Sequence, residues 1–166
     1  MDSASGRLSA ALLLLYYIQG NYAAIYDKPL FDAPFVPLKE SALPLTPEAK
    51  EVVDRVLNTF GMYRGKVLES ITHKEAPWLD ARKGFLPDET SHAEISLDAM
   101  KSYFKKVDEK YNIRTEDGLR KYIEKMTYRN KPLSGNSYST ACFFYKLISL
   151  FAYSNKSVER TFIKSS

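Results

Sequence analysis

Two histidines, each followed two positions later by a glutamate, are the residues of this chain best suited to chemistry: His73 with Glu75, and His92 with Glu94. In zinc deaminases such a pair supplies a metal ligand and a proton-transferring carboxylate, while a downstream P-C-x-x-C supplies the other ligands. The single cysteine here cannot complete that site. A mixed site of His73, Glu75, Asp80 and His92 in a metal-dependent hydrolase is the remaining metal alternative. We favour the interpretation that these histidines bond to backbone groups or titrate at the surface, and we expect no metal.

Cys142 is the only candidate thiol nucleophile, with His73 as its base. Its neighbours, Thr140-Ala141 before it and Phe143-Phe144 after it, instead indicate a small apolar residue in the core of a helix. The sequence contains no P-loop, no G-x-G-x-x-G and no G-x-S-x-G. We therefore expect a protein without catalytic residues and without a cofactor.

Basic residues alternate with tyrosines over residues 120–131. Nucleic-acid-binding faces use this mixture, because cations neutralise phosphates and rings stack on bases. An alternative function is therefore a nucleic-acid-binding regulator that uses Arg120, Lys121, Lys125, Arg129 and Lys131. A solvated helix face backed by core tyrosines is the interpretation that we favour.

The composition is that of a globular protein of 166 residues, with 45% hydrophobic and 27% charged residues. The formal net charge of +4 permits an acidic partner but does not require nucleic acid. A lone cysteine excludes an intrachain disulfide and suits a reducing compartment, so we expect a cytoplasmic protein.

An unbroken apolar run over residues 10–18 follows Arg7 and is similar to the core of a secretory signal. The run is far shorter than the roughly 20 residues of a membrane-spanning helix. Asp2 offsets the charge of Arg7, and Gln19-Gly20-Asn21 is a poor cleavage context. A buried helix is the better interpretation, and we expect no contact with a membrane.

Apolar residues recur at helical spacing along most of the chain, which predicts an all-α fold, a compact multi-helix bundle. Leu8, Leu12, Leu15, Ile18 and Tyr22 predict the first helix, and five prolines over residues 29–47 predict an irregular connector. Further helices are expected over residues 47–60, about 65–72, 96–107, from 116 to a close at Asn130 and Pro132, and roughly 137–153. Their predicted N-caps are Thr46, Ser96 and Thr115, and Gly61 is a predicted left-handed stop. We expect residues 1–110 and a C-terminal helical extension, 111–166, to pack as one globular unit.

Residues 71–82 hold the only tryptophan, next to a proline and among charged side chains. Pro77 ends one helix or begins the next, which predicts a corner between two short helices. Trp78 is expected to fill a pocket beside Pro77, and if part of it is exposed it would suit an interface, where Trp is enriched.

Three segments resemble the Panacea (SocA-like) antitoxin domain family. These are Leu14-Leu15-Tyr16-Tyr17-Ile18-Gln19-Gly20, then Lys28-Pro29-Leu30-Phe31, and above all residues 72–82, which are similar to T-H-x-E-x-P-W-x-x-A-R. Ile95 and Tyr103-Phe104 resemble the family's closing helix, so the resemblance covers residues 8–108. The middle segment is shortened: Phe35-Val36-Pro37 stands where the family has a G-P-V turn and a helix.

The resemblance implies a non-enzymatic role in a bacterial or phage toxin–antitoxin system. The domain would neutralise a partner toxin by direct binding, or present it to a protease. The matching residues at the corner are Thr72, His73, Glu75, Pro77, Trp78, Asp80 and Arg82, with Asp80 and Arg82 in local ion pairs, and those of the first helix are Tyr16, Tyr17 and Gln19. Beyond the resemblance, Tyr128, Arg129 and Lys131 are candidate partner-binding residues, and self-association stays open.

Overall fold

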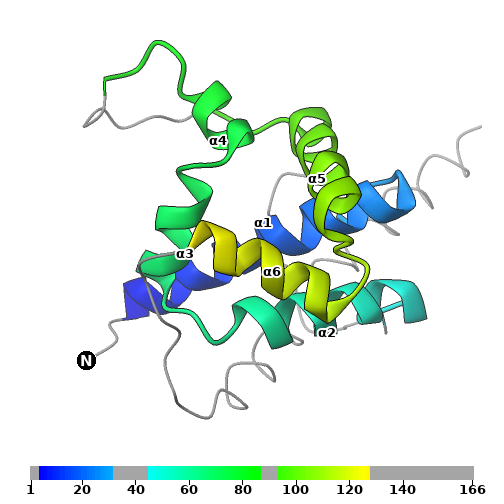
Figure 1. The fold of residues 1–166 in the computed structure, drawn as a ribbon. Coiled ribbons are helices and arrows are strands. Elements are labelled where there is room, and N and C mark those ends of the chain that lie inside the picture. Colours follow the sequence, from blue (N-terminus) through cyan, green and yellow to red (C-terminus); the bar gives the residue numbers. More distant parts are fainter. Residues whose placement is uncertain (1–3, 32–44, 87–92, 128–166) are drawn as a thin grey trace, which may run out of the picture.

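The computed structural model describes residues 4–31, 45–86 and 93–127, with side chains from residue 10 onward, and forms six α-helices and no strand over these ranges (Figure 1). The all-α prediction is thereby confirmed for this part of the chain. The helix expected over 137–153 lies outside the described residues. Among the helices that are described, none has the length and hydropathy needed to cross a membrane.

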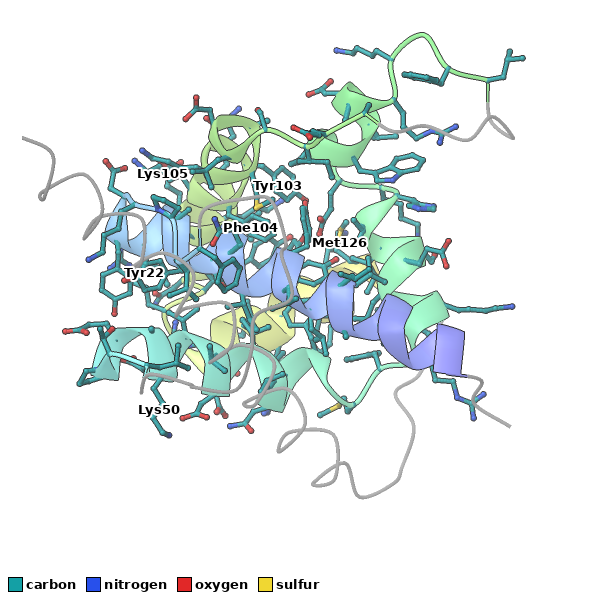
Figure 2. The ribbon with its side chains drawn as sticks, turned by 180° about the vertical axis from the view of Figure 1, so that it is seen from behind. Tyr22, Lys50, Tyr103, Phe104, Lys105 and Met126 are labelled. Carbon is teal, nitrogen blue, oxygen red and sulfur yellow. The ribbon has the colours of Figure 1, made fainter. Side chains whose placement is uncertain are left out.

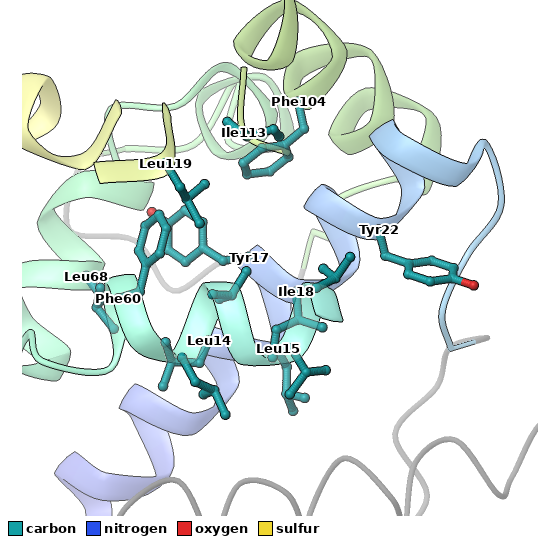
Figure 3. Close-up of a cluster of buried hydrophobic side chains, with 14 of the residues drawn as sticks. Leu14, Leu15, Tyr17, Ile18, Tyr22, Phe60, Leu68, Phe104, Ile113 and Leu119 are labelled. Carbon is teal, nitrogen blue, oxygen red and sulfur yellow. The ribbon is translucent and has the colours of Figure 1, made fainter. Parts of the chain in front are cut away.

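Helix α1 (Ala4–Tyr26) runs through the middle of the molecule and packs against α2, α3 and α5 (Figure 1). Tyr17 is fully buried, and its ring stacks on that of Phe60 with 4.2 Å between centroids (Figure 3). Leu12 was expected on the buried side, but 48% of it is exposed. That expectation was wrong because Leu12 shares its helical face with Tyr16 and Gln19, which are only partly buried.

Helix α2 (Pro47–Phe60) begins as predicted, because the Thr46 side chain accepts a hydrogen bond of 3.3 Å from the Ala49 amide. Its valines and Phe60 face the core. Gly61 keeps a right-handed conformation (φ −64°), so the predicted left-handed stop is wrong. The chain instead leaves the helix through a turn in which the Tyr63 amide donates to the Phe60 carbonyl.

Helices α3 (Gly65–Thr72) and α4 (Ala76–Ala81) flank the predicted corner. The turn between them is closed by the Glu75 amide, which donates to the Thr72 carbonyl at 3.0 Å. Pro77 lies in the first turn of α4, where a backbone N–H would have no acceptor within the helix, so its absence costs nothing. Helix α4 packs against α5 and lies at the end of the molecule opposite α2 (Figure 1).

Helices α5 (Leu97–Tyr111) and α6 (Glu116–Met126) complete the bundle, and α6 packs on α2 and α5. Both predicted caps are confirmed: Ser96 accepts from the Ala99 amide and Thr115 from the Gly118 amide. Just beyond the C-terminal end of α1, the Asp27 carboxylate pairs with Lys101 and Lys105 of α5 at 2.9 and 2.6 Å. Lys105 is labelled in Figure 2.

At Gly20, α1 and α5 approach each other closely. A Cβ atom at this position would lie 2.3 Å from the fully buried ring of Phe104. We expect Gly20→Ala to lower the free energy of unfolding by about 1–2 kcal/mol, because overpacking outweighs the better helix propensity of alanine. Urea denaturation measures the change. Ser102→Ala, at an exposed position of α5, is the control, and equal stabilities of the two variants would contradict the close packing.

Candidate functional site

The side chain of Glu75 lies inside the bundle, with no exposed surface, and accepts three hydrogen bonds from tyrosines. Tyr16 donates to Oε2 at 2.7 Å, and Tyr17 donates to Oε1 at 3.1 Å. Tyr122 also donates to Oε1. Because Tyr16 and Tyr17 belong to α1 and Tyr122 to α6, a residue of the corner is bonded to both helices.

Two further hydroxyl groups extend this network. The Thr72 hydroxyl lies 3.1 Å from that of Tyr17 and also donates to the Leu68 carbonyl. The Tyr103 hydroxyl of α5 lies 3.1 Å from that of Tyr122. We call this set the tyrosine–carboxylate cluster; its members are Tyr16, Tyr17, Thr72, Glu75, Tyr103 and Tyr122.

The carboxylate of Glu75 forms no salt bridge with any residue of the described ranges. Burial therefore raises its pKa, and the hydrogen bonds from Tyr122, Tyr16 and Tyr17 offset this effect only in part. Burial also raises the pKa of Tyr103 to about 12, and those of the three bonded tyrosines well above their ordinary value. The phenols consequently stay protonated, and Glu75 is the member of the cluster that gains and loses a proton.

On the outer side of the same corner, aromatic and cationic side chains stack on one another. The His73 ring lies on that of Trp78 at 4.0 Å with an interplanar angle of 25°. The Arg82 guanidinium lies 5.2 Å from the centroid of Trp78 and 6.0 Å from that of Phe85, within the range of cation–π attraction. We call these four residues the stacked corner: His73, Trp78, Arg82 and Phe85.

Several apolar side chains of this segment are exposed, Phe85 of the stacked corner among them. Leu79 is 48% exposed, Phe85 40% and Leu86 72%. The chain after α4 projects away from the bundle (Figure 1), and the Arg82 side chain braces it by donating to the Leu86 carbonyl at 2.7 Å. Apolar side chains gathered on a projecting surface are typical of an interaction site.

The structure buries Pro77 and leaves Trp78 half-buried, with its indole against the His73 ring and the Arg82 guanidinium. Trp78 is thus partly exposed, the case in which the sequence suited it to an interface. Asp80 forms the expected local ion pair, with Lys83 at 2.7 Å.

Gln19 joins the two N-terminal segments of the resemblance. Its side-chain carbonyl accepts from the amides of Leu30 and Phe31 at 3.0 and 3.1 Å, and its amide group donates to the Phe31 carbonyl at 2.9 Å. The residues singled out in the first helix thus have structural partners: two tyrosines bond to Glu75, and Gln19 bonds to the segment after α1.

The alternative metal site gains no support from the described residues. His73 lies against Trp78, Glu75 is bonded to tyrosines and Asp80 to Lys83. No group of three or more His, Cys, Asp or Glu side chains within the described ranges could hold a metal ion. His92 and Cys142 lie outside these ranges.

The basic face of α6 also differs from what a nucleic-acid site would need. Tyr122 is only 2% exposed and bonds to Glu75, so its ring is not available for stacking on a base. Arg120 and Lys125 are exposed, and Lys121 pairs with Asp117 at 2.7 Å. The remaining residues proposed for nucleic-acid or partner binding lie outside the described ranges: Tyr128, Arg129 and Lys131.

Comparison with protein-family models, curated proteins and solved structures gave no match. The geometry of the chain's own side chains therefore carries the functional argument. Within that geometry, sequence reasoning missed Tyr122 as a partner of Glu75 and Tyr103 as a partner of Tyr122. No local signal in the sequence connects Tyr122 to a glutamate 47 residues earlier.

The raised pKa of Glu75 predicts how stability depends on pH. The folded state holds the Glu75 proton more tightly than the unfolded state, in which the pKa is near its ordinary 4.5. The stabilisation is therefore complete below pH 4.5 and is lost as the pH rises through the folded-state pKa. We expect Glu75→Gln to remove this component from the pH dependence of the unfolding free energy, measured by urea denaturation at several pH values.

Glu109→Gln is the matched control, since the Glu109 side chain is exposed on α5 and forms none of the ion pairs found among the described residues. This variant should keep the wild-type pH dependence. A Glu75→Gln variant whose stability varies with pH as steeply as that of the wild type would contradict the assignment.

Proposed function

We propose that this chain is a non-enzymatic protein-binding domain, an antitoxin or adaptor of the Panacea type that neutralises a toxin in the cytoplasm by direct contact. The resemblance of residues 8–108 to that family motivates the choice. The surface formed by the stacked corner together with Leu79 and Leu86 is the observation that supports it.

The composition of this surface suits protein recognition. Tryptophan and arginine are enriched among the residues that dominate binding energies, and here Trp78 and Arg82 lie one against the other. Leu79, Phe85 and Leu86 add exposed apolar area beside them. A partner that covers these side chains would gain hydrophobic area and a preformed aromatic–cation stack.

While Glu75 is bonded to the bundle, the surface is also held in place before a partner arrives. The residue that precedes α4, Glu75, is bonded to α1 and α6, and Pro77 is buried beside it. A surface that is ordered in the free protein loses less conformational entropy on binding. This preorganisation favours a binding role over a purely structural one for the exposed ring stack.

The nucleic-acid and hydrolase alternatives have less support. A nucleic-acid site would need Tyr122 as a stacking ring, but Tyr122 is bonded to Glu75. A hydrolase would need His73, Glu75 and Asp80 as metal ligands, but each of them is bonded to or stacked on another side chain. Self-association through the same surface would compete with toxin binding. Measuring the oligomeric state of the free protein tests for such self-association.

The chain offers a matched pair of leucines for testing the surface. Leu79 and Leu12 are both 48% exposed, but only Leu79 lies on α4. We expect Leu79→Asp to weaken binding of the cognate toxin about tenfold or more, a loss of about 1.4 kcal/mol, because it places a charge in an apolar interface. Binding is measured by calorimetry with the toxin encoded by the neighbouring open reading frame.

Leu12→Asp should bind like the wild type, and each variant is also scored for rescue of growth when co-expressed with that toxin. Absence of any binding or rescue by the wild-type chain would overturn the antitoxin function. Equal weakening by both substitutions would overturn the assignment of the surface.

A further inference from the structure

We propose that Glu75 is a proton-operated latch, which holds the stacked corner on the bundle when it is protonated and releases it when it is charged. The latch is a property of the isolated chain. Only its consequence, that partner binding should respond to pH, rests on the proposed function.

The corner needs a tether because α4 is too short to hold its own position. The helix has six residues, and no side chain caps its first turn. Isolated helices of this length are unstable in water, so tertiary contacts must fix it. The residue at its N-cap, Glu75, turns its carboxylate away from the helix and into the bundle, where the hydroxyls of α1 and α6 bind it.

The groups that face this carboxylate are neutral hydroxyls from four helices. Tyr16 and Tyr17 of α1 and Tyr122 of α6 bond to it directly, whereas Thr72 of α3 and Tyr103 of α5 each reach it through a bonded tyrosine. Among the described residues, no Lys, Arg or His side chain forms a salt bridge with the Glu75 carboxylate. When it is charged, the carboxylate thus has hydrogen-bond donors but no oppositely charged partner within the described residues.

Protonation removes the cost of the buried charge without breaking the network. A neutral carboxyl group donates one hydrogen bond and still accepts others, and a phenol both donates and accepts. Deprotonation leaves a charge in a site where the carboxylate has no contact with solvent, which is costly unless the charge is paired. Raising the pH therefore shifts the equilibrium from the latched corner toward a released one, in which water reaches the carboxylate.

The chain carries its own reporter of this change. Trp78 is the only tryptophan, and it lies three residues after Glu75 on the helix that the latch would hold. Its emission and its accessibility to a small quencher report the position of the corner alone. The His73 ring is stacked on the same indole, so its contribution to the emission must be separated from that of the latch.

The experiment is a pH titration of Trp78 fluorescence and acrylamide quenching in the full chain, from acid to neutral pH. The wild type should show a rise in the quenching constant and a red shift of emission as the pH increases. Glu75→Gln should keep the low quenching constant at every pH. His73→Gln should retain the rise, because it leaves the latch intact.

A rise that persists in Glu75→Gln, or one that disappears in His73→Gln, would overturn the proposal. Tyr122→Phe gives a second test should Glu75→Gln fail to fold, as judged by circular dichroism. Loss of one donor to the charged carboxylate should move the midpoint of the rise to a higher pH, and an unchanged midpoint would contradict the latch. No toxin is needed, so failure of the proposed function leaves this result standing.

Discussion

The fully buried carboxylate of Glu75 is the constraint on which the rest of the structure depends. Removing an ionised group from water costs several kcal/mol unless other groups replace the lost hydration. Here the replacements come from hydroxyls on α1 and α6, which are 47 to 59 residues away in sequence. Both helices must therefore be correctly placed before the corner between α3 and α4 can close. A single side chain thus couples the local turn to the global packing.

The apolar core fixes the positions of those hydroxyls. Tyr17 is held by the stacked ring of Phe60, and α1 approaches α5 closely because Gly20 leaves room for Phe104. At the same time Tyr122 is carried into the interior by the buried face of α6, together with Leu119 and Ile123. The polar cluster therefore lies within an apolar shell, and each hydroxyl reaches Glu75 because its ring is packed.

Much of this fold could be predicted from local signals. The caps at Thr46, Ser96 and Thr115 and the boundaries of α3 follow from short-range chemistry, and the structure confirms them. The conformation of Gly61 and the exposure of Leu12 could not be predicted, because they depend on how the chain continues and on which face a neighbour covers. The partners of Glu75 were unpredictable for the same reason: a glutamate among charged residues resembles a surface residue until three distant tyrosines are brought to it.

The same residue connects the interior to the exposed surface, since His73 and Trp78 flank Glu75 and face outward. The central claim is that this carboxylate is buried, bonded only to hydroxyls, and holds its proton more tightly than an ordinary glutamate. The direct measurement is an NMR titration of the ¹³C-labelled Glu75 carboxyl group in the folded protein. We predict a midpoint above the ordinary value of 4.5, with the ring signals of the neighbouring tyrosines changing in parallel. A midpoint at or below 4.5, as in a solvent-exposed or ion-paired glutamate, would contradict the account.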